Sequence, residues 1–224
     1  MASYKLNIAR IRGCPPAAEL GEAIEGYGLP EYEEYGVLNC TSGQSTVYGT
    51  IVRKTQQTIQ RLNAEAGEVT DVAVEKATVY PFGVNPAREV LETYAGSAGG
   101  IAQVAAFLAG HLALPTIVEL IEIDVLTAID KLASRTEKFQ LRSARVSDYA
   151  HNSFMNGTYG PKFLDTEHGK DFLGEYADYI KAASVCFAGP SGRINVALTP
   201  AACFSFSCSE DDHPTAQGVL RKLI

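Results

Sequence analysis

The chain has 224 residues, of which 46% are hydrophobic and 20% are charged, and this composition predicts a folded protein with a sizeable core. Its formal net charge of −7 argues against a protein whose whole surface binds nucleic acid or anionic lipid, although a local basic face is compatible with it. The five cysteines are an odd number without a C-x-x-C pair, which favours reduced thiols, and the first residues lack the apolar segment of a signal peptide. We therefore expect a cytoplasmic protein.

The first half of the chain contains patterns typical of both strands and helices. Alternating apolar residues predict an opening strand over 4–8, and the connection from there to about residue 35 has no regular pattern. A strand is expected over 69–80, with an irregularity near Glu75 and Lys76 where the apolar positions change parity. The clearest helical spacing predicts an amphipathic helix, and its apolar side consists of Tyr48, Ile51, Val52, Thr55, Ile59 and Leu62.

The middle of the chain is unusually apolar. Asn85 and Pro86 predict the start of a helix that continues to about residue 94. From Ala95 to Val118 there is no Asp, Glu, Lys or Arg, so this segment is long enough to span a bilayer. Several glycines and Pro115 interrupt it, however, and we expect a buried helix over 98–112 and no membrane partner.

The second half has a more regular pattern. It predicts a strand over 121–125, a helix over 126–134, a strand over 138–146 and three consecutive strands over 179–188, 193–198 and 202–207, followed by a last helix. We expect an α+β fold, with a mostly antiparallel sheet and helices packed on one side. The whole of 1–224 is expected to be a single domain, and 96–100 is the best place for a subdivision.

Potential metal ligands and acid/base groups cluster in one region of the sequence. Carboxylates and imidazoles together can hold a divalent ion, or can make a general base. The surrounding residues are typical of loops, so turn-capping aspartates and surface histidines are the competing interpretation. His213 could add a third imidazole, although acidic residues before it are explained by the start of the last helix. The candidate ligands are Asp148, His151, Asp165, His168 and Asp171.

A second candidate site is a basic stretch. Residues 131–145 contain five cations and one acid, Glu137, so they carry +4 and the rest of the chain carries −7 − 4 = −11. Such a stretch could contact phosphates or an acidic partner, although charge runs are more often solvated faces. The candidate binding residues are Lys131, Arg135, Lys138, Arg142 and Arg145.

No phosphate-binding loop and no G-x-S-x-G nucleophile motif is present in the sequence. The leading hypothesis is therefore a non-enzymatic interaction or regulatory module without a cofactor, which works within a larger assembly. Its partner would be a protein, or a nucleic acid bound through the basic stretch. The alternative is a metal-dependent hydrolase, acting on phosphodiesters with a divalent ion held by the Asp/His cluster.

Overall fold

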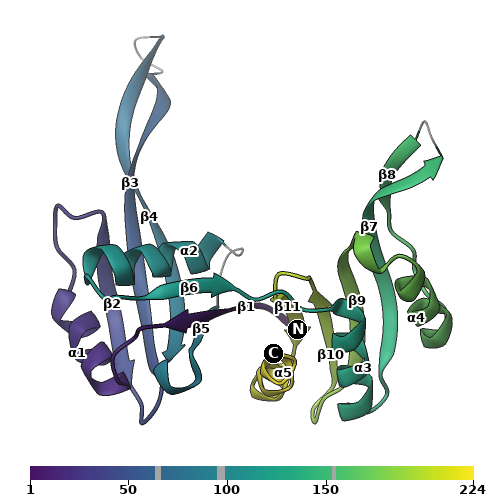
Figure 1. Cartoon of the computed structure of the whole chain (residues 1–224). Helices are drawn as coiled ribbons and strands as arrows, with labels where there is room; N and C mark the ends of the chain where they lie inside the picture. Colours follow the sequence, from purple (N-terminus) through teal and green to yellow (C-terminus); the bar gives the residue numbers. More distant parts are fainter. Residues whose placement is uncertain (64–66, 95–98, 153–154) are drawn as a thin grey trace. The chain divides into compact units, whose positions relative to one another are not determined.

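The computed structural model describes residues 1–63, 67–94, 99–152 and 155–224, except for the side chains of 63, 148–152, 155 and 156 (Figure 1). The chain divides into two compact units. Unit 1 contains Met1–Arg10, Tyr94 and Glu119–Ile224, and unit 2 contains Ile11–Thr93 and Gly99–Val118. Both units combine helices with antiparallel strands, so the expected α+β class is confirmed. A single domain over the whole chain stays a prediction.

The sheet of unit 1 is an antiparallel meander joined by the first strand of the chain. The three consecutive strands expected near the C-terminus are confirmed, and the turn between the first two is closed by a hydrogen bond from Gly189 N to Gly192 O. The opening strand pairs with the last one in an antiparallel register. The order across the sheet is β1 (Ala2–Arg12), β11 (Cys203–Cys208), β10 (Arg193–Leu198), β9 (Ile180–Ala188), β7 (Gln140–Asn152) and β8 (Met155–Tyr159).

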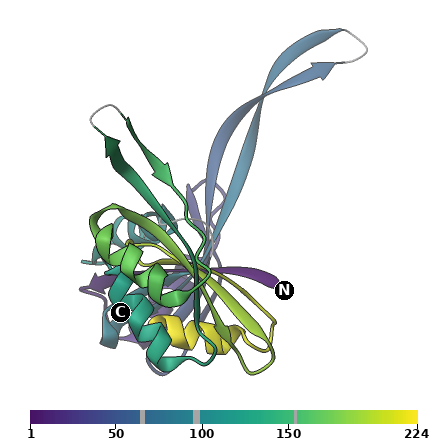
Figure 2. The same cartoon turned by 90° about the vertical axis from the view of Figure 1, so that its right-hand side faces the viewer.

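Three helices cover one face of this sheet, as Figure 2 shows: α3 (Val125–Arg135), α4 (Thr166–Glu175) and α5 (His213–Arg221). A short 3-10 helix, η3 (Ala177–Tyr179), precedes β9. Strand residues of alternate positions are buried beneath the helices, because the side chains of a strand point to opposite faces in turn. These core residues include Leu6, Phe204, Phe206, Val196, Val185 and Leu141.

The strands of unit 2 are antiparallel and follow the order β2 (Tyr35–Ser42), β3 (Val47–Asn63), β4 (Glu68–Asn85) and β5 (Val90–Thr93). Two helices pack on these strands: α1 (Ala17–Tyr27) against β2 and β3, and α2 (Gly99–Ala106) against β4 and β5. α2 continues into a π-helical turn, η2 (Phe107–His111), which contacts α1. The rings of Tyr27 and Phe107 meet edge to face at 5.2 Å. The helix expected over 98–112 is thus confirmed in its described part, but it is buried on one side only, since Ala102, Ala106 and Ala109 are exposed. No described helix is long and apolar enough to cross a membrane.

The expected amphipathic helix over 48–62 is wrong, because these residues form β3. They pair with β4 in a continuous register from Val47↔Val84 to Asn63↔Glu68, so the expected irregularity near Glu75 is wrong as well. β-branched residues are frequent in this segment and favour an extended backbone. Ile59 and Leu62 are 40% and 65% exposed, so the helical spacing of apolar residues here does not mark a buried side.

Other boundaries also differ from the sequence-based expectations. The helix expected after Asn85 is a single 3-10 turn, η1 (Pro86–Arg88), whose N-terminus the Asn85 side chain caps, and β5 follows it. No strand occupies 121–125; a short strand, β6 (Ile117–Leu120), ends before it and pairs with β1. The helices α1 and α4 were not predicted, because glycines dilute the apolar pattern in both segments.

Candidate functional site

The sheet of unit 1 has a second face that none of the described helices of this unit covers. Its members follow from the pairing register, since directly paired residues point to the same side. Lys5 pairs with Ser205, Ser205 with Ala197, Ala197 with Ser184 and Ser184 with Ser143. We call this surface the open face; its sixteen positions are Ser3, Lys5, Asn7, Cys203, Ser205, Ser207, Arg193, Asn195, Ala197, Ala182, Ser184, Cys186, Ala188, Gln140, Ser143 and Arg145.

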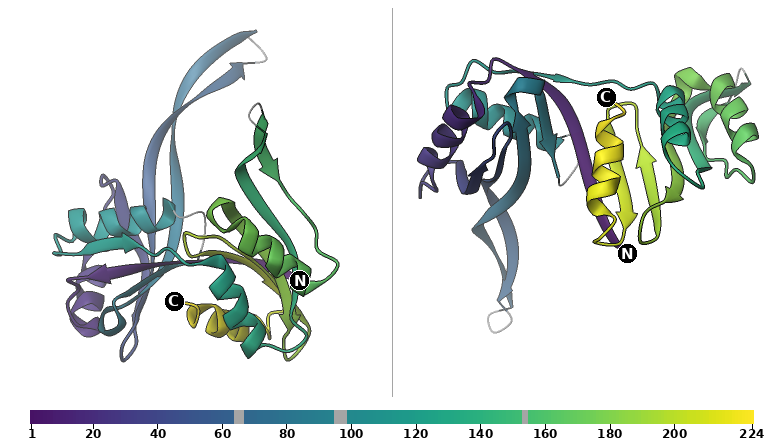
Figure 3. Two further views of the ribbon diagram at one scale, coloured as in Figure 1. Left: turned by 45° about the vertical axis from the view of Figure 1, so that its right-hand side comes forward. Right: turned by 90° about the horizontal axis from the view of Figure 1, so that it is seen from below.

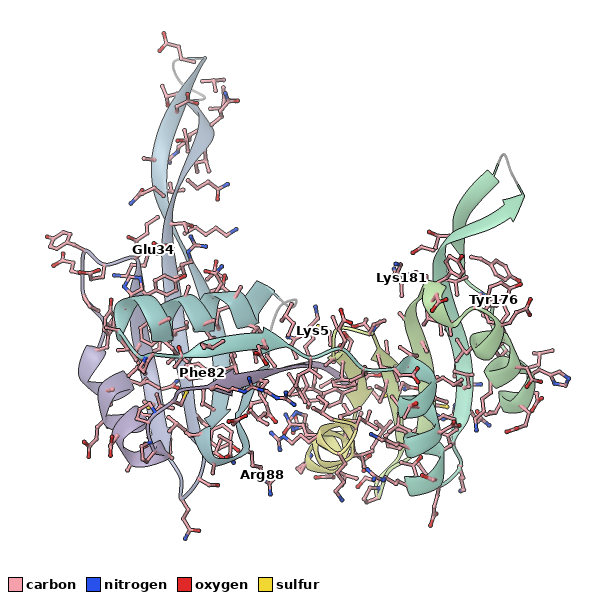
Figure 4. The ribbon with its side chains drawn as sticks, in the orientation of Figure 1. Lys5, Glu34, Phe82, Arg88, Tyr176 and Lys181 are labelled. Carbon is pink, nitrogen blue, oxygen red and sulfur yellow. The ribbon has the colours of Figure 1, made fainter. Side chains whose placement is uncertain are left out.

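The open face contains no Asp or Glu, although acids outnumber cations 26 to 19 in the whole chain. Its three cations are Lys5, Arg193 and Arg145, all exposed, and none is in an ion pair with another described residue. The face therefore carries +3, and the rest of the chain carries −7 − 3 = −10. Figure 4 shows Lys5 projecting from β1.

Small polar side chains fill the space between the cations. Eleven of the sixteen positions carry a side-chain N–H or O–H donor, five of them serines. Asn195 Nδ2 donates to Ser207 Oγ at 3.4 Å, which ties neighbouring strands together on this side. Asn7 and Cys186 are buried, and the other fourteen positions are exposed or partly exposed. Four strand spacings separate Lys5 from β7, so the cations span about 19 Å at about 4.8 Å per spacing.

Most acids of unit 1 lie instead on its helices and helix ends. Asp124 caps α3 by accepting hydrogen bonds from Leu126 N and Thr127 Oγ1. Asp130 of α3 forms an ion pair with Lys170 of α4 at 2.9 Å. Because these helices cover the other side of the sheet (Figure 3), the two sides of unit 1 differ in charge.

The five residues of the predicted basic stretch are distributed over different parts of unit 1. Lys131 Nζ and Arg135 Nη1, on α3, donate to the backbone carbonyls of Leu223 and Lys222 near the C-terminus. Lys138 is exposed in the turn before β7 and adopts a positive φ of 51°. Arg142 is exposed where the β7–β9 register shifts, and Arg145 belongs to the open face. Their role in binding stays a prediction.

The Asp/His cluster is only partly described, since the side chains of Asp148 and His151, both in β7, lie outside the described residues. Asp165 caps α4 by accepting from Glu167 N and His168 N, and its Oδ2 lies 2.5 Å from His168 Nδ1. The hydrogen bond with His168 and the two backbone amides lower the pKa of Asp165. His168 and Asp171 are exposed, and no group of three or more metal-ligating side chains occurs among the described residues.

Asp212 and His213 anchor the start of α5. Asp212 is buried and accepts from Ser191 N and from Ser209 Oγ, both at 2.8 Å, so its carboxylate fastens the β9–β10 turn to the helix. The His213 ring lies 4.2 Å from Tyr4 and 5.6 Å from Phe206, on the helix-covered side. Burial, and then the charge of Arg221, lower the pKa of His213.

A small apolar cavity of about 50 Å³ is lined by Val146, Tyr159, Phe172 and Tyr176, from β7, β8, α4 and the residue after α4. The Phe172 and Tyr176 rings pack against each other at 4.6 Å. This volume is far below that of pockets for nucleotides or cofactors, which hold several hundred Å³. We regard the cavity as a packing defect of the aromatic cluster.

No protein-family model matches the chain, and a search of curated proteins finds no significant match. The open face of unit 1 is therefore the feature from which we infer a function. Four residues of the open face were not predicted from the sequence as site residues: Lys5, Arg193, Asn195 and Ser205. Their signal was the polar half of each strand's alternation, which lacks acids at the sixteen positions of the open face.

Proposed function

We propose that this protein is a non-enzymatic binding module that holds a nucleic-acid backbone on the open face of unit 1. The observation that carries the proposal is a sheet face of sixteen positions with three cations, many hydroxyl and amide donors, and no carboxylate, in a chain of net charge −7. Phosphate groups are bound in proteins by Lys and Arg together with Ser, Asn and Gln side chains, which is the composition of this face.

The residues that are missing from the open face favour a nucleic acid over an acidic protein. The centres of protein–protein interfaces are enriched in aromatic residues and Met, and their strongest contacts are Trp, Tyr and Arg. The open face has no aromatic residue, no Met and no large aliphatic side chain, and Ala182, Ala188 and Ala197 are its only aliphatic members. Without aromatic rings it cannot stack on bases, so we expect contacts to the backbone and little dependence on sequence.

The charge distribution supports a defined orientation of binding. The +3 face attracts phosphates, whereas the rest of unit 1, with 10 further cations and 14 acids, carries 10 − 14 = −4 and repels them. A polyanion is therefore stabilised on one side of unit 1 only. Each phosphate that the protein neutralises releases counterions from the nucleic acid. Affinity should fall steeply as the salt concentration rises.

Fluorescence anisotropy of labelled single-stranded and double-stranded oligonucleotides at 50–200 mM salt tests the proposal. In a Lys5→Gln/Arg145→Gln variant, we expect weaker binding and a log K against log[salt] slope that is shallower by about 1.4–1.8, because each lost phosphate contact reduces the slope by about 0.7–0.9. The matched control is Arg221→Gln/Lys222→Gln, which makes the same change in net charge at the end of α5.

The control variant should keep the wild-type affinity and slope, and circular dichroism should show that both variants are folded. An equal loss of affinity in the two variants would mean that only net charge matters, and the open face would lose its role. Absence of any binding at 50 mM salt to either kind of oligonucleotide would refute the proposed function itself.

A further inference from the structure

The longest strand pair of the protein extends beyond the rest of its sheet in unit 2. β2 pairs with β3 only as far as Arg53, and β5 pairs with β4 only from Phe82 onwards. From Thr55 to Leu62 in β3 and from Val69 to Lys76 in β4, the two strands pair only with each other among the described residues. We call the pairs from Thr55↔Lys76 to Leu62↔Val69 the arm; Figure 1 shows it as a twisted ribbon.

The two faces of the arm have opposite charges. The register places Thr55, Gln57, Ile59, Arg61, Thr70, Val72, Val74 and Lys76 on one face, which has two cations and no acid. It places Gln56, Thr58, Gln60, Leu62, Val69, Asp71, Ala73 and Glu75 on the other, which has two acids and no cation. We call these the cationic face and the acidic face.

These four charges have no ion-pair partner among the described residues. The cations at the base of the arm, in contrast, are already engaged. Arg53 Nε lies 2.5 Å from Glu34 Oε1, and Lys54 Nζ donates to the carbonyls of Pro30 and Glu31 at 2.7 and 3.0 Å. Figure 4 shows Glu34 at this base. The base therefore fixes the arm to unit 2 and leaves the charges beyond it unmatched.

The arm also exposes apolar surface that its own two strands cannot cover. Ile59, Leu62 and Val69 are 40%, 65% and 58% exposed. An isolated two-stranded ribbon is only marginally stable in water, and a further layer or strand is what usually stabilises it. A surface that packs on the arm would bury these side chains and satisfy its charges.

We infer that the arm is a self-association surface, in which the cationic face of one copy packs on the acidic face of a second copy of this chain. The complementarity of the two faces carries this inference. In the register of the arm, Lys76 and Glu75 lie one level apart next to the body of unit 2, and Arg61 and Asp71 lie one level apart near the other end. Two arms stacked in opposite directions, which keeps the helices of the two copies of unit 2 apart, therefore bring Arg61 against Glu75 and Lys76 against Asp71 to within one level.

The geometry of the stack predicts how the copies associate. Because one face meets the opposite face, each added copy leaves one cationic and one acidic face free, so assembly does not stop at a dimer. The arm offers roughly 25 by 10 Å per face, from about 3.4 Å per residue level and two strands. A stack buries on the order of 500 Å² in total, less than half of a standard specific interface, so association is weak and depends on concentration.

Sedimentation velocity of the full chain at low salt, from about 10 to 500 μM, measures this association with charge-swap variants. Arg61→Glu/Lys76→Glu makes both faces acidic, for a net charge of −7 − 4 = −11, and Asp71→Lys/Glu75→Lys makes both faces cationic, for −7 + 4 = −3. We expect each variant alone to associate at least ten-fold more weakly than the wild type. A mixture of the two should associate, and the quadruple variant, again at −7, should recover the wild-type behaviour.

Several results would overturn the inference. A wild-type protein that stays monomeric over the whole range would do so, as would a quadruple variant that does not recover. If the arm bound nucleic acid instead, the Asp71→Lys/Glu75→Lys variant would bind oligonucleotides more tightly and no swap would restore assembly. The Lys5→Gln/Arg145→Gln variant should assemble normally, so failure of the proposed function and failure of self-association are separate outcomes.

Discussion

Two glycines in α4 should respond in opposite ways to the same substitution. Replacing a helical Gly by Ala adds about 0.5–1 kcal/mol to stability, because Ala loses less backbone entropy on folding. At Gly174 an added Cβ meets nothing within 4 Å, so only this gain applies. At Gly169 the Cβ would lie 2.7 Å from Leu141 Cδ2 and 2.9 Å from Phe163 Cγ. Leu141 is buried and only 2% exposed, so it cannot move into solvent.

Overpacking of this kind costs about 1–3 kcal/mol. We therefore expect Gly169→Ala to be less stable than Gly174→Ala by about 1–3 kcal/mol, which corresponds to about 2–4 °C in Tm for each kcal/mol in a chain of this length. Thermal melts followed by circular dichroism measure the difference. A second variant, Gly169→Ala/Leu141→Val, should recover part of the loss by removing the contacted methyl group. If Gly169→Ala were as stable as Gly174→Ala, the close packing of α4 on β7 would be refuted.

Two further predictions concern the start of α5. Asp212→Ala should lower the stability by about 1.5–3 kcal/mol, because Ser191 N and Ser209 Oγ lose the buried, charged acceptor that holds the β9–β10 turn on α5. Urea denaturation measures this, and a loss below about 0.5 kcal/mol would contradict it. In the folded state the pKa of His213 is lowered from 6.5, first by burial and then by the charge of Arg221. The stability contributed by the neutral His213 ring is therefore present above pH 6.5 and is lost as the pH falls towards the folded-state pKa. His213→Phe keeps the stacked ring, and its Tm should fall less than that of the wild type between pH 7.5 and 5.5; equal shifts would remove His213 from the pH dependence.

The sequence predicted the meander of unit 1 because its strands are half-buried. Ile194, Val196 and Leu198 alternate with polar residues, and one side of the strand must face the core. The polar residues of the same alternation form the open face. What could not be predicted is the neighbour of each strand. Only the fold brings β1 beside β11 and so places Lys5 on the same surface as Ser205.

The arm was mispredicted for a physical reason. Away from the body of unit 2 both of its faces are solvent-exposed, so no core selects which side carries the apolar residues. In β3, Ile59 lies on one face and Leu62 on the other, which produced an apparent helical spacing. In β4, Val72 and Val74 lie on one face while Ala77 and Val79 lie on the other, which produced the apparent parity change near Glu75. Among the described residues, no further layer covers the arm. The local apolar pattern therefore did not predict its secondary structure.

The basic stretch shows the limit of counting charges along a sequence. Lys131 and Arg135 are near Arg145 in the chain, but their donors bind backbone carbonyls at the end of α5, where cations also suit the helix dipole. The cations of the open face come from three distant segments. A linear window cannot find them, because strand pairing decides which side chains share a surface.

The most direct test of the open face is protection of Lys5 from chemical acetylation, read by mass spectrometry with and without a saturating oligonucleotide at 50 mM salt. Lys5 is exposed on the open face, and Lys222, exposed at the end of α5, is the internal control. We expect the oligonucleotide to slow acetylation of Lys5 several-fold while leaving Lys222 unchanged. Equal acetylation of Lys5 in the presence and absence of bound oligonucleotide would contradict the assignment of the open face as the nucleic-acid site.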